Sequence, residues 1–194
     1  MAAVSDVLIL ARVQLNELDA LTLDDYASAA RERLSTVEGF VGMGTWQRSD
    51  DPFAILIAYH YGGVEAAERG LVALTGIRLL TEQQSADYRP ADVLRVKVRG
   101  NHGCRMHEVP TGAYLSISVR VSDPGYGVEL EEEIERIFDE LQLMPGYLGS
   151  LHGPNDVLDE EIVGLVLWES AEAFAASIPP SARNFEVRLY RRLA

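Results

Sequence analysis

Apolar and polar positions follow the same order twice along the chain, at a separation of 107 residues. Glu38–Gly42 is similar in type to Pro145–Gly149, and Gly39 and Gly146 are 146 − 39 = 107 positions apart. At this offset both copies carry apolar residues at i, i+4, i+7 and i+11, the stripe of an amphipathic helix. These positions are Leu23, Ala27, Ala30 and Leu34 in the first copy, and Leu130, Ile134, Ile137 and Leu141 in the second. The sequence therefore predicts one structural unit that occurs twice.

Each copy predicts the order strand, helix, strand, strand, helix, strand. In the first copy we expect strands at about 7–14, 40–47, 53–61 and 93–99, and helices at about 22–36 and 63–74. In the second copy we expect strands at about 114–121, 147–152, 161–168 and 185–192, and helices at about 128–142 and 170–177. Turn residues separate the two middle strands of each copy, which predicts a hairpin. Gly39 and Gly146 follow the first helix of each copy, where glycine is a favourable C-terminal cap.

A βαββαβ unit forms a four-stranded antiparallel sheet with both helices on one face. The segments Ala54–Ala58 and Ile162–Leu167 are apolar at every position, which indicates sheets that are buried on both faces. We therefore predict an α+β fold of two ferredoxin-like units, packed sheet to sheet within one chain as an α/β barrel. The expected units are residues 1–99, with an insertion at about 74–90, and residues 113–194, joined by a linker at 100–112.

The charge balance narrows the choice of partners. The chain has 17 basic and 30 acidic residues and a net charge of −13, which repels nucleic acid phosphates and anionic membranes. Cys104 is the single cysteine, so an intrachain disulfide is excluded. No apolar run approaches the ~18 residues of a membrane-spanning helix, and the first residues lack the features of a signal peptide. We expect a cytoplasmic protein with neither nucleic acid nor membrane as a partner.

The segments Val37–Met43 and Leu167–Phe174 resemble the dimeric α/β-barrel superfamily, in particular antibiotic-biosynthesis-type monooxygenases. The resemblance covers most of both halves. Because members are usually single units that dimerise through their sheets, it implies that the two partners are fused in this chain. It also implies cofactor-independent oxidation of a small aromatic or quinol substrate. The haem-degrading members use an asparagine in the first strand and a histidine after the second helix. Neither residue occurs at these places here, so haem is not expected.

Comparison of the two copies selects three candidate site residues in the first copy. They are Arg12, Trp46 and His60, whose counterparts are Val119, Gly153 and Leu167. Arg12 and Trp46 are expected at one rim of the sheet, where a cation beside an aromatic plane binds an anionic aromatic ligand. His60 is expected about 17–20 Å away, at the other end of the third strand, as a general base. The alternatives are an Arg12 paired with a carboxylate, a Trp46 that packs the sheet and a hydrogen-bonded structural His60.

No metal site is expected. His102, Cys104 and His107 match no strong zinc spacing, and the charge run Asp156, Asp159, Glu160 and Glu161 is typical of a solvated turn. Three functions remain open: an oxygenase-like enzyme, a non-catalytic binder of a small apolar molecule, and a structural protein. An enclosed cavity between sheet and helices would separate the first two from the third. We expect such a site in the first copy, with residues 74–90 as a lid. Pairing of whole chains into a homodimer through an outer surface also remains open.

Overall fold

The structure is a computed structural model in which residues 5–15, 22–75, 77, 92–158, 160–178 and 187–193 are described. Most of the expected insertion at 74–90 lies outside the described residues, as does Asp159 of the charge run. The lid expected from this insertion therefore remains a prediction.

The first unit contains β1 (Val7–Gln14), α2 (Leu23–Leu34), β2 (Phe40–Arg48), β3 (Asp51–Tyr61), α3 (Val64–Leu74) and β4 (Asp92–Lys97). A short strand, β5 (Gly100–Gly103), follows. The second unit contains β6 (Tyr114–Val121), α5 (Gly127–Leu141), β7 (Tyr147–Pro154), β8 (Glu161–Trp168), α6 (Ala171–Ser177) and β9 (Val187–Arg192). Every strand and helix that the sequence predicts is present in the described residues, with ends within about two residues of the expected ones. β5 is the addition.

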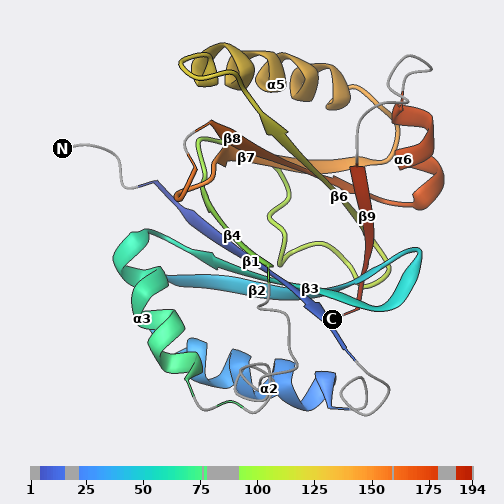
Figure 1. The fold of residues 1–194 in the computed structure, drawn as a ribbon. Coiled ribbons are helices and arrows are strands. Elements are labelled where there is room, and N and C mark those ends of the chain that lie inside the picture. Colours follow the sequence, from blue (N-terminus) through green and yellow to red (C-terminus); the bar gives the residue numbers. More distant parts are fainter. Residues whose placement is uncertain are drawn as a thin grey trace.

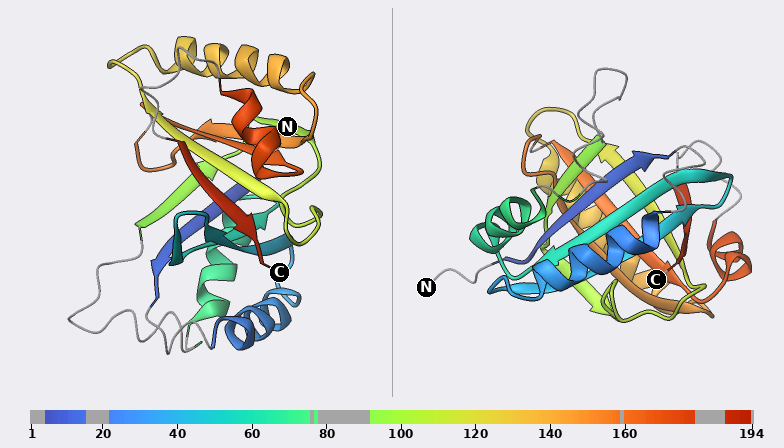
Figure 2. Two further views of the ribbon diagram at one scale, coloured as in Figure 1. Left: turned by 90° about the vertical axis from the view of Figure 1, so that its right-hand side faces the viewer. Right: turned by 90° about the horizontal axis from the view of Figure 1, so that it is seen from below.

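The described strands form one antiparallel sheet in the order β4-β1-β3-β2-β9-β6-β8-β7-β5. The internal orders β4-β1-β3-β2 and β9-β6-β8-β7 are the same, so β1 and β6 occupy equivalent central positions. The tandem ferredoxin-like arrangement is thereby confirmed. The two halves of the sheet face each other, with α2 and α3 outside one half and α5 and α6 outside the other (Figure 1). Figure 2 shows the strands wrapping round the space between them.

A pair of small residues repeats in both units and explains part of the 107-residue pattern. Gly39 and Gly146 have positive φ angles of 84° and 79°, which glycine adopts without strain. A Cβ atom on Gly39 would lie 2.8 Å from the Cβ of Ala66, and one on Gly146 would lie 2.6 Å from that of Ala173. In each unit, therefore, the second helix packs directly on the turn that follows the first. This contact requires glycine against alanine in both copies.

The segment expected as a linker, residues 100–112, contributes to the barrel. β5 pairs with β7 in the register Gly100↔His152 to Gly103↔Gly149, and a bridge joins Val96 to Asn155. Met106 and Val109 then enter the apolar core between the two sheets, where they are 2% and 4% exposed.

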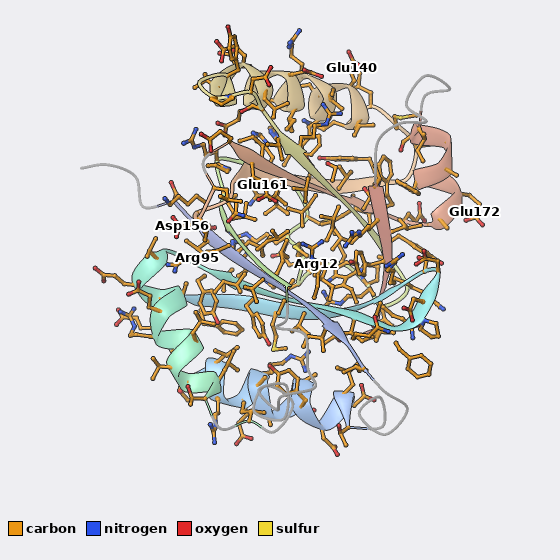
Figure 3. All side chains as sticks on the ribbon, in the orientation of Figure 1. Arg12, Arg95, Glu140, Asp156, Glu161 and Glu172 are labelled. Atoms are coloured by element: carbon orange, nitrogen blue, oxygen red, sulfur yellow. The ribbon has the colours of Figure 1, made fainter. Side chains whose placement is uncertain are left out.

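Ion pairs reinforce this junction between β4 and the second unit. Arg95 Nε lies 3.0 Å from a carboxylate oxygen of Asp156, and Lys97 pairs with the same carboxylate. Figure 3 shows Arg95 and Asp156 beside each other. β4 and β5, the first and last strands of the strand order, are consecutive in the chain and thus connect its two ends. β2 and β9 pair in the middle of the order. None of the described helices combines the length and the apolar character required to cross a membrane.

Candidate functional site

A cavity of about 570 Å³ lies between the sheet and the helices of the second unit. This volume is within the usual range for small-molecule pockets, ~300–1,000 Å³. β6 and β8 form its floor, α5 and α6 form its walls, and the start of β9 closes one side. Its lining is mostly apolar and includes the aromatic side chains Phe138, Trp168 and Phe174.

The cavity exists because the second unit lacks side-chain volume that the first unit has. In the first unit, Tyr26 on α2 and Tyr59 on β3 occupy the equivalent space, with their hydroxyl oxygens 2.5 Å apart. At the 107-residue offset their counterparts are Glu133 and Val166, and both line the cavity. Close packing is the rule in protein interiors. A space of this size at the place of two tyrosines is therefore a specific feature of the second unit.

The floor of the cavity is polar where its counterpart in the first unit is apolar. Ser116, Ser118 and Arg120 alternate along β6 and line the cavity. Their counterparts at the 107-residue offset are the buried apolar residues Ile9, Ala11 and Val13. Sequence reasoning missed these residues, although the same comparison of copies could have found them. That comparison selected positions that are polar or aromatic in the first copy, whereas these three positions are polar in the second copy.

Hydrogen bonds hold the polar groups of the cavity in place. The indole N–H of Trp168 donates to Ser116 Oγ over 3.0 Å, and Trp168 is 1% exposed. Near the mouth, Arg120 donates to Glu133 over 3.2 Å. The arrangement offers aromatic surfaces for a planar ligand, hydroxyl groups on the floor, and a guanidinium that can stabilise a negatively charged oxygen.

Arg12 and Trp46 lie together, as the sequence predicts. Both pair with Leu56 of β3, so their side chains share one row that faces the space between the two sheets. Trp46 is fully buried, and the guanidinium of Arg192 lies 5.2 Å from its ring centroid. An internal cation thus already covers this ring. Arg12 lines a second cavity, which Trp46 does not line. Ligand binding by these two residues remains a prediction.

His60 lies apart from both cavities. It pairs with Leu8, four residues along β3 from Leu56, a separation of about 13 Å along the strand that is shorter than the expected ~17–20 Å. It is 2% exposed, and its Nε2 lies 2.9 Å from a carboxylate oxygen of Asp6. Burial lowers the pKa of His60, and the neighbouring Asp6 carboxylate partly opposes this effect. A role of His60 as general base remains a prediction, and its surroundings also fit the structural alternative.

Comparison with known proteins gives matches in structure alone. No family model and no curated protein sequence matches the chain. A candidate monooxygenase of Fusobacterium nucleatum superposes with a TM-score of 0.78 at 11% identity, over 100% of this chain and 94% of that one. An anthrone oxidase-like protein has a TM-score of 0.70 at 12% identity, over 98% and 92% of the two chains.

A ferredoxin-fold protein of Listeria monocytogenes, described as related to antibiotic biosynthesis monooxygenases, has a TM-score of 0.58 at 8% identity. The match covers 98% of this chain and 95% of that one. With the tandem units, the common strand order and the sheet-to-sheet packing, the chain has the dimeric α/β-barrel fold of the antibiotic-biosynthesis-monooxygenase-like proteins, with both ferredoxin-like units in a single polypeptide.

Proposed function

We propose that this protein is a monooxygenase-like oxidoreductase that oxidises a small aromatic or quinol-type substrate in the cavity of the second unit. The observation that carries the proposal is the 570 Å³ space on the polar face of β6, at the place that Tyr26 and Tyr59 occupy in the first unit. The names of the monooxygenase and anthrone oxidase-like neighbours support the reaction class. The net charge of −13 supports a small cytoplasmic molecule over nucleic acid.

The residues of the cavity suit the removal of a proton from an aromatic carbon acid. Phe138, Trp168 and Phe174 hold the rings. Arg120 stabilises the enolate or phenolate oxygen that forms as the proton leaves. Glu133, hydrogen-bonded to Arg120, is the carboxylate that accepts the proton. Reaction of the resulting anion with O₂ then converts a methylene group to a carbonyl.

The balance of this reaction needs no external reductant. In R–CH₂–R′ + O₂ → R–CO–R′ + H₂O, the methylene carbon loses four electrons and O₂ gains four. One oxygen atom becomes the carbonyl oxygen, and the other leaves as water with the two hydrogens. The substrate supplies every electron that O₂ accepts.

A second candidate is a protein that binds a small aromatic molecule without turning it over. One observation favours it: the side chain of Glu133 is 52% exposed at the mouth, while Ser116 on the floor is already engaged by Trp168. A floor whose hydroxyl is engaged in this way is suited to holding a ligand.

Oxygen consumption with anthrone, which carries such a methylene group, tests the proposal. Val166→Tyr restores the tyrosine that Tyr59 provides in the first unit and fills the cavity. The matched control is Val72→Tyr on α3, where the side chain is 74% exposed. We expect the wild type and the control to consume O₂ and form the carbonyl product, and Val166→Tyr to lose about tenfold or more of the rate.

Three results would decide against an oxygenase that acts in this cavity. Saturable anthrone binding without O₂ consumption, abolished by Val166→Tyr, would establish the binding protein. Equal rates in both tyrosine variants would place the chemistry elsewhere. Absence of both binding and turnover would exclude both functions for these substrates. Circular dichroism of each variant shows whether the fold is retained.

A further inference from the structure

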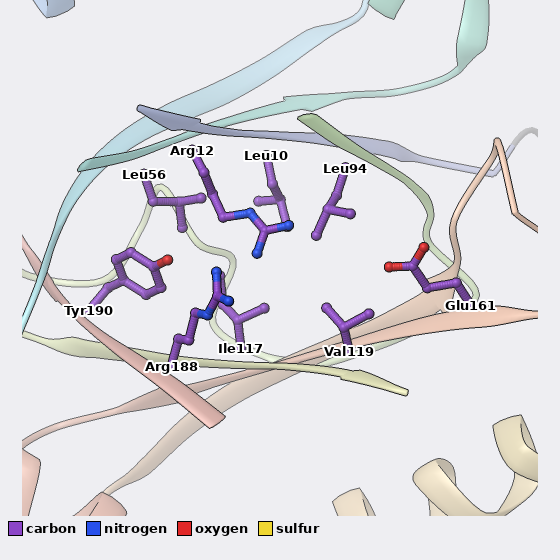
Figure 4. Close-up of a pocket in the computed structure, with 9 residues that line it drawn as sticks. All are labelled: Leu10, Arg12, Leu56, Leu94, Ile117, Val119, Glu161, Arg188 and Tyr190. Atoms are coloured by element: carbon purple, nitrogen blue, oxygen red, sulfur yellow. The ribbon is translucent and has the colours of Figure 1, made fainter. Parts of the chain in front are cut away.

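A second cavity, of about 240 Å³, lies between the two halves of the sheet, on the opposite face of β6 from the proposed substrate pocket. The side chains of β6 alternate between the two faces, so Ser116 and Ser118 point outward, and Ile117 and Val119 point inward. This inner cavity is lined by Leu10, Arg12, Leu56, Leu94, Ile117, Val119, Glu161, Arg188 and Tyr190 (Figure 4).

Two guanidinium groups converge at one end of the inner cavity. Arg12 extends from β1 and Arg188 from β9, and their side chains point toward each other in Figure 4, with Tyr190 beside them. Arg188 is hydrogen-bonded to the Tyr190 hydroxyl. Glu161 lies at the other end, where its carboxylate accepts a hydrogen bond of 3.0 Å from Asn155. The cavity therefore has a basic end, an apolar middle and an acidic end.

The fold does not require these polar residues, because the first unit does without them. Arg188 and Tyr190 pair with the first strand of the second unit where Leu94 and Val96 pair with that of the first unit. The equivalent positions of the two last strands thus hold arginine and tyrosine in β9, and leucine and valine in β4. Apolar side chains satisfy the barrel at both positions in β4.

Arg12 shows the same contrast in the opposite direction, since its counterpart in β6 is Val119. Arginine from β1 and arginine from β9 therefore reach the same space from different units, each at a position where the other unit has an aliphatic residue. The chain carries a net charge of −13, yet two arginine side chains line this one cavity. Arginine is the residue best suited to hold a carboxylate by paired hydrogen bonds.

We propose that the inner cavity binds a small organic carboxylate. Arg12 and Arg188 hold the carboxylate, and Tyr190 donates a hydrogen bond to it. Aliphatic side chains such as Leu94 contact the body of the ligand, and Glu161 accepts a hydrogen bond from a hydroxyl or amino group at its far end. A volume of 240 Å³ is below the ~300–1,000 Å³ of pockets for drug-sized ligands, so the ligand is a single-ring acid or smaller. This site is separate from the proposed substrate pocket and does not depend on it.

Calorimetric titration of the full chain with benzoate and 4-hydroxybenzoate tests the site. Benzamide and benzyl alcohol, which have the same ring without the negative charge, are the ligand controls. Arg12→Val and Arg188→Leu introduce the residues that the other unit uses at these positions. Arg191→Leu removes an exposed arginine from the neighbouring position of β9 as the matched control.

We expect both acids to bind the wild type, 4-hydroxybenzoate more tightly because of Glu161, and the neutral analogues not to bind. Arg12→Val and Arg188→Leu each weaken acid binding about tenfold or more, whereas Arg191→Leu changes it by less than about twofold. Arg188→Lys keeps the charge without the planar fork and gives intermediate affinity. This variant keeps the test decisive if an aliphatic replacement does not fold.

Several results would overturn the site. They are no saturable binding of either acid below about 10 mM, equal affinity for benzamide, or an Arg191→Leu effect as large as that of Arg188→Leu. Val166→Tyr fills the outer pocket and should bind benzoate as the wild type does. Loss of benzoate binding in that variant would assign the acid to the outer pocket and refute the inner site. If the protein does not oxidise anthrone, the conclusion about benzoate binding in the inner cavity does not change.

Discussion

At the scale of single residues, Tyr26 and Tyr59 distinguish the two units. Burial raises the pKa of Tyr26, and it raises that of Tyr59 well above the ordinary value. Both hydroxyls are therefore neutral near pH 7, and one donates to the other over 2.5 Å. A buried hydroxyl that loses its partner keeps the cost of its desolvation. Each tyrosine hydroxyl is therefore compensated for its burial only if the other tyrosine is present.

This pair gives a double-mutant prediction. Tyr59→Phe should lower the free energy of unfolding by about 1–3 kcal/mol, because it leaves the Tyr26 hydroxyl buried without its acceptor or donor. Tyr26→Phe should have a similar effect. The double variant should lose clearly less than the sum of the two, since neither hydroxyl then remains. Urea denaturation measures all three, and strictly additive losses would contradict the coupling.

At the scale of elements, a close contact between backbones lies where the chain leaves β4 and runs along β7. A Cβ atom on Gly153 would lie 1.8 Å from the Lys97 carbonyl oxygen, a distance that no side chain tolerates. Gly100 similarly passes against the ring of His152. The counterpart of Gly153 in the first unit is Trp46, which packs under Arg192 instead. The sequence comparison interpreted this difference between glycine and tryptophan as functional. The close approach of the Lys97 carbonyl explains the glycine at position 153 by packing alone.

Gly153→Ala should therefore separate β7 from β4–β5 and destabilise the protein by about 1–3 kcal/mol or more, as overpacking does. Gly62→Ala is the control, because the nearest atom to its added Cβ is 3.6 Å away. That variant should cost about 1 kcal/mol or less. Thermal and urea unfolding of the two variants provides the comparison. Equal stability losses would show that the junction relaxes without cost.

At the scale of the whole molecule, each sheet half buries its inner face against the other. Leu8, Leu10, Leu56 and Ala58 of the first unit share one core with Leu115 and Leu165 of the second. Strand pairing also crosses between the two units, because β5 after β4 pairs with β7, and β9 pairs with β2. A single unit therefore leaves an apolar face and unpaired strand edges exposed.

We accordingly expect residues 1–99, produced alone, to dimerise or aggregate, whereas the full chain stays folded without a partner. Sedimentation of the two proteins at matched concentrations is the measurement. The exposed Val72→Tyr variant of the full chain serves as a reference for a surface change that leaves the sheet interface intact. A monodisperse, monomeric 1–99 fragment with native-like helix content would refute this prediction.

The elements, the duplication and the packing of the two sheets could all be predicted from the amino-acid sequence. These follow from local and periodic signals: the helical stripe that includes Leu23 and Leu130, the turn glycines Gly39 and Gly146, and the continuously apolar third strands. The shared row of Arg12 and Trp46 could also be predicted, because register in a hairpin follows from the turn and the pleat.

The positions of the cavities, and the side chains that meet in them, could not be predicted without the folded structure. A cavity depends on the summed side-chain volumes of elements that are far apart in sequence, here Glu133 on α5 and Val166 on β8. The meeting of Arg12 with Arg188, and the burial of Met106 between the sheets, depend on how the barrel closes. Closure rests on contacts between β4–β5 and β7, and these have no periodic signal along the chain because they join segments of different units.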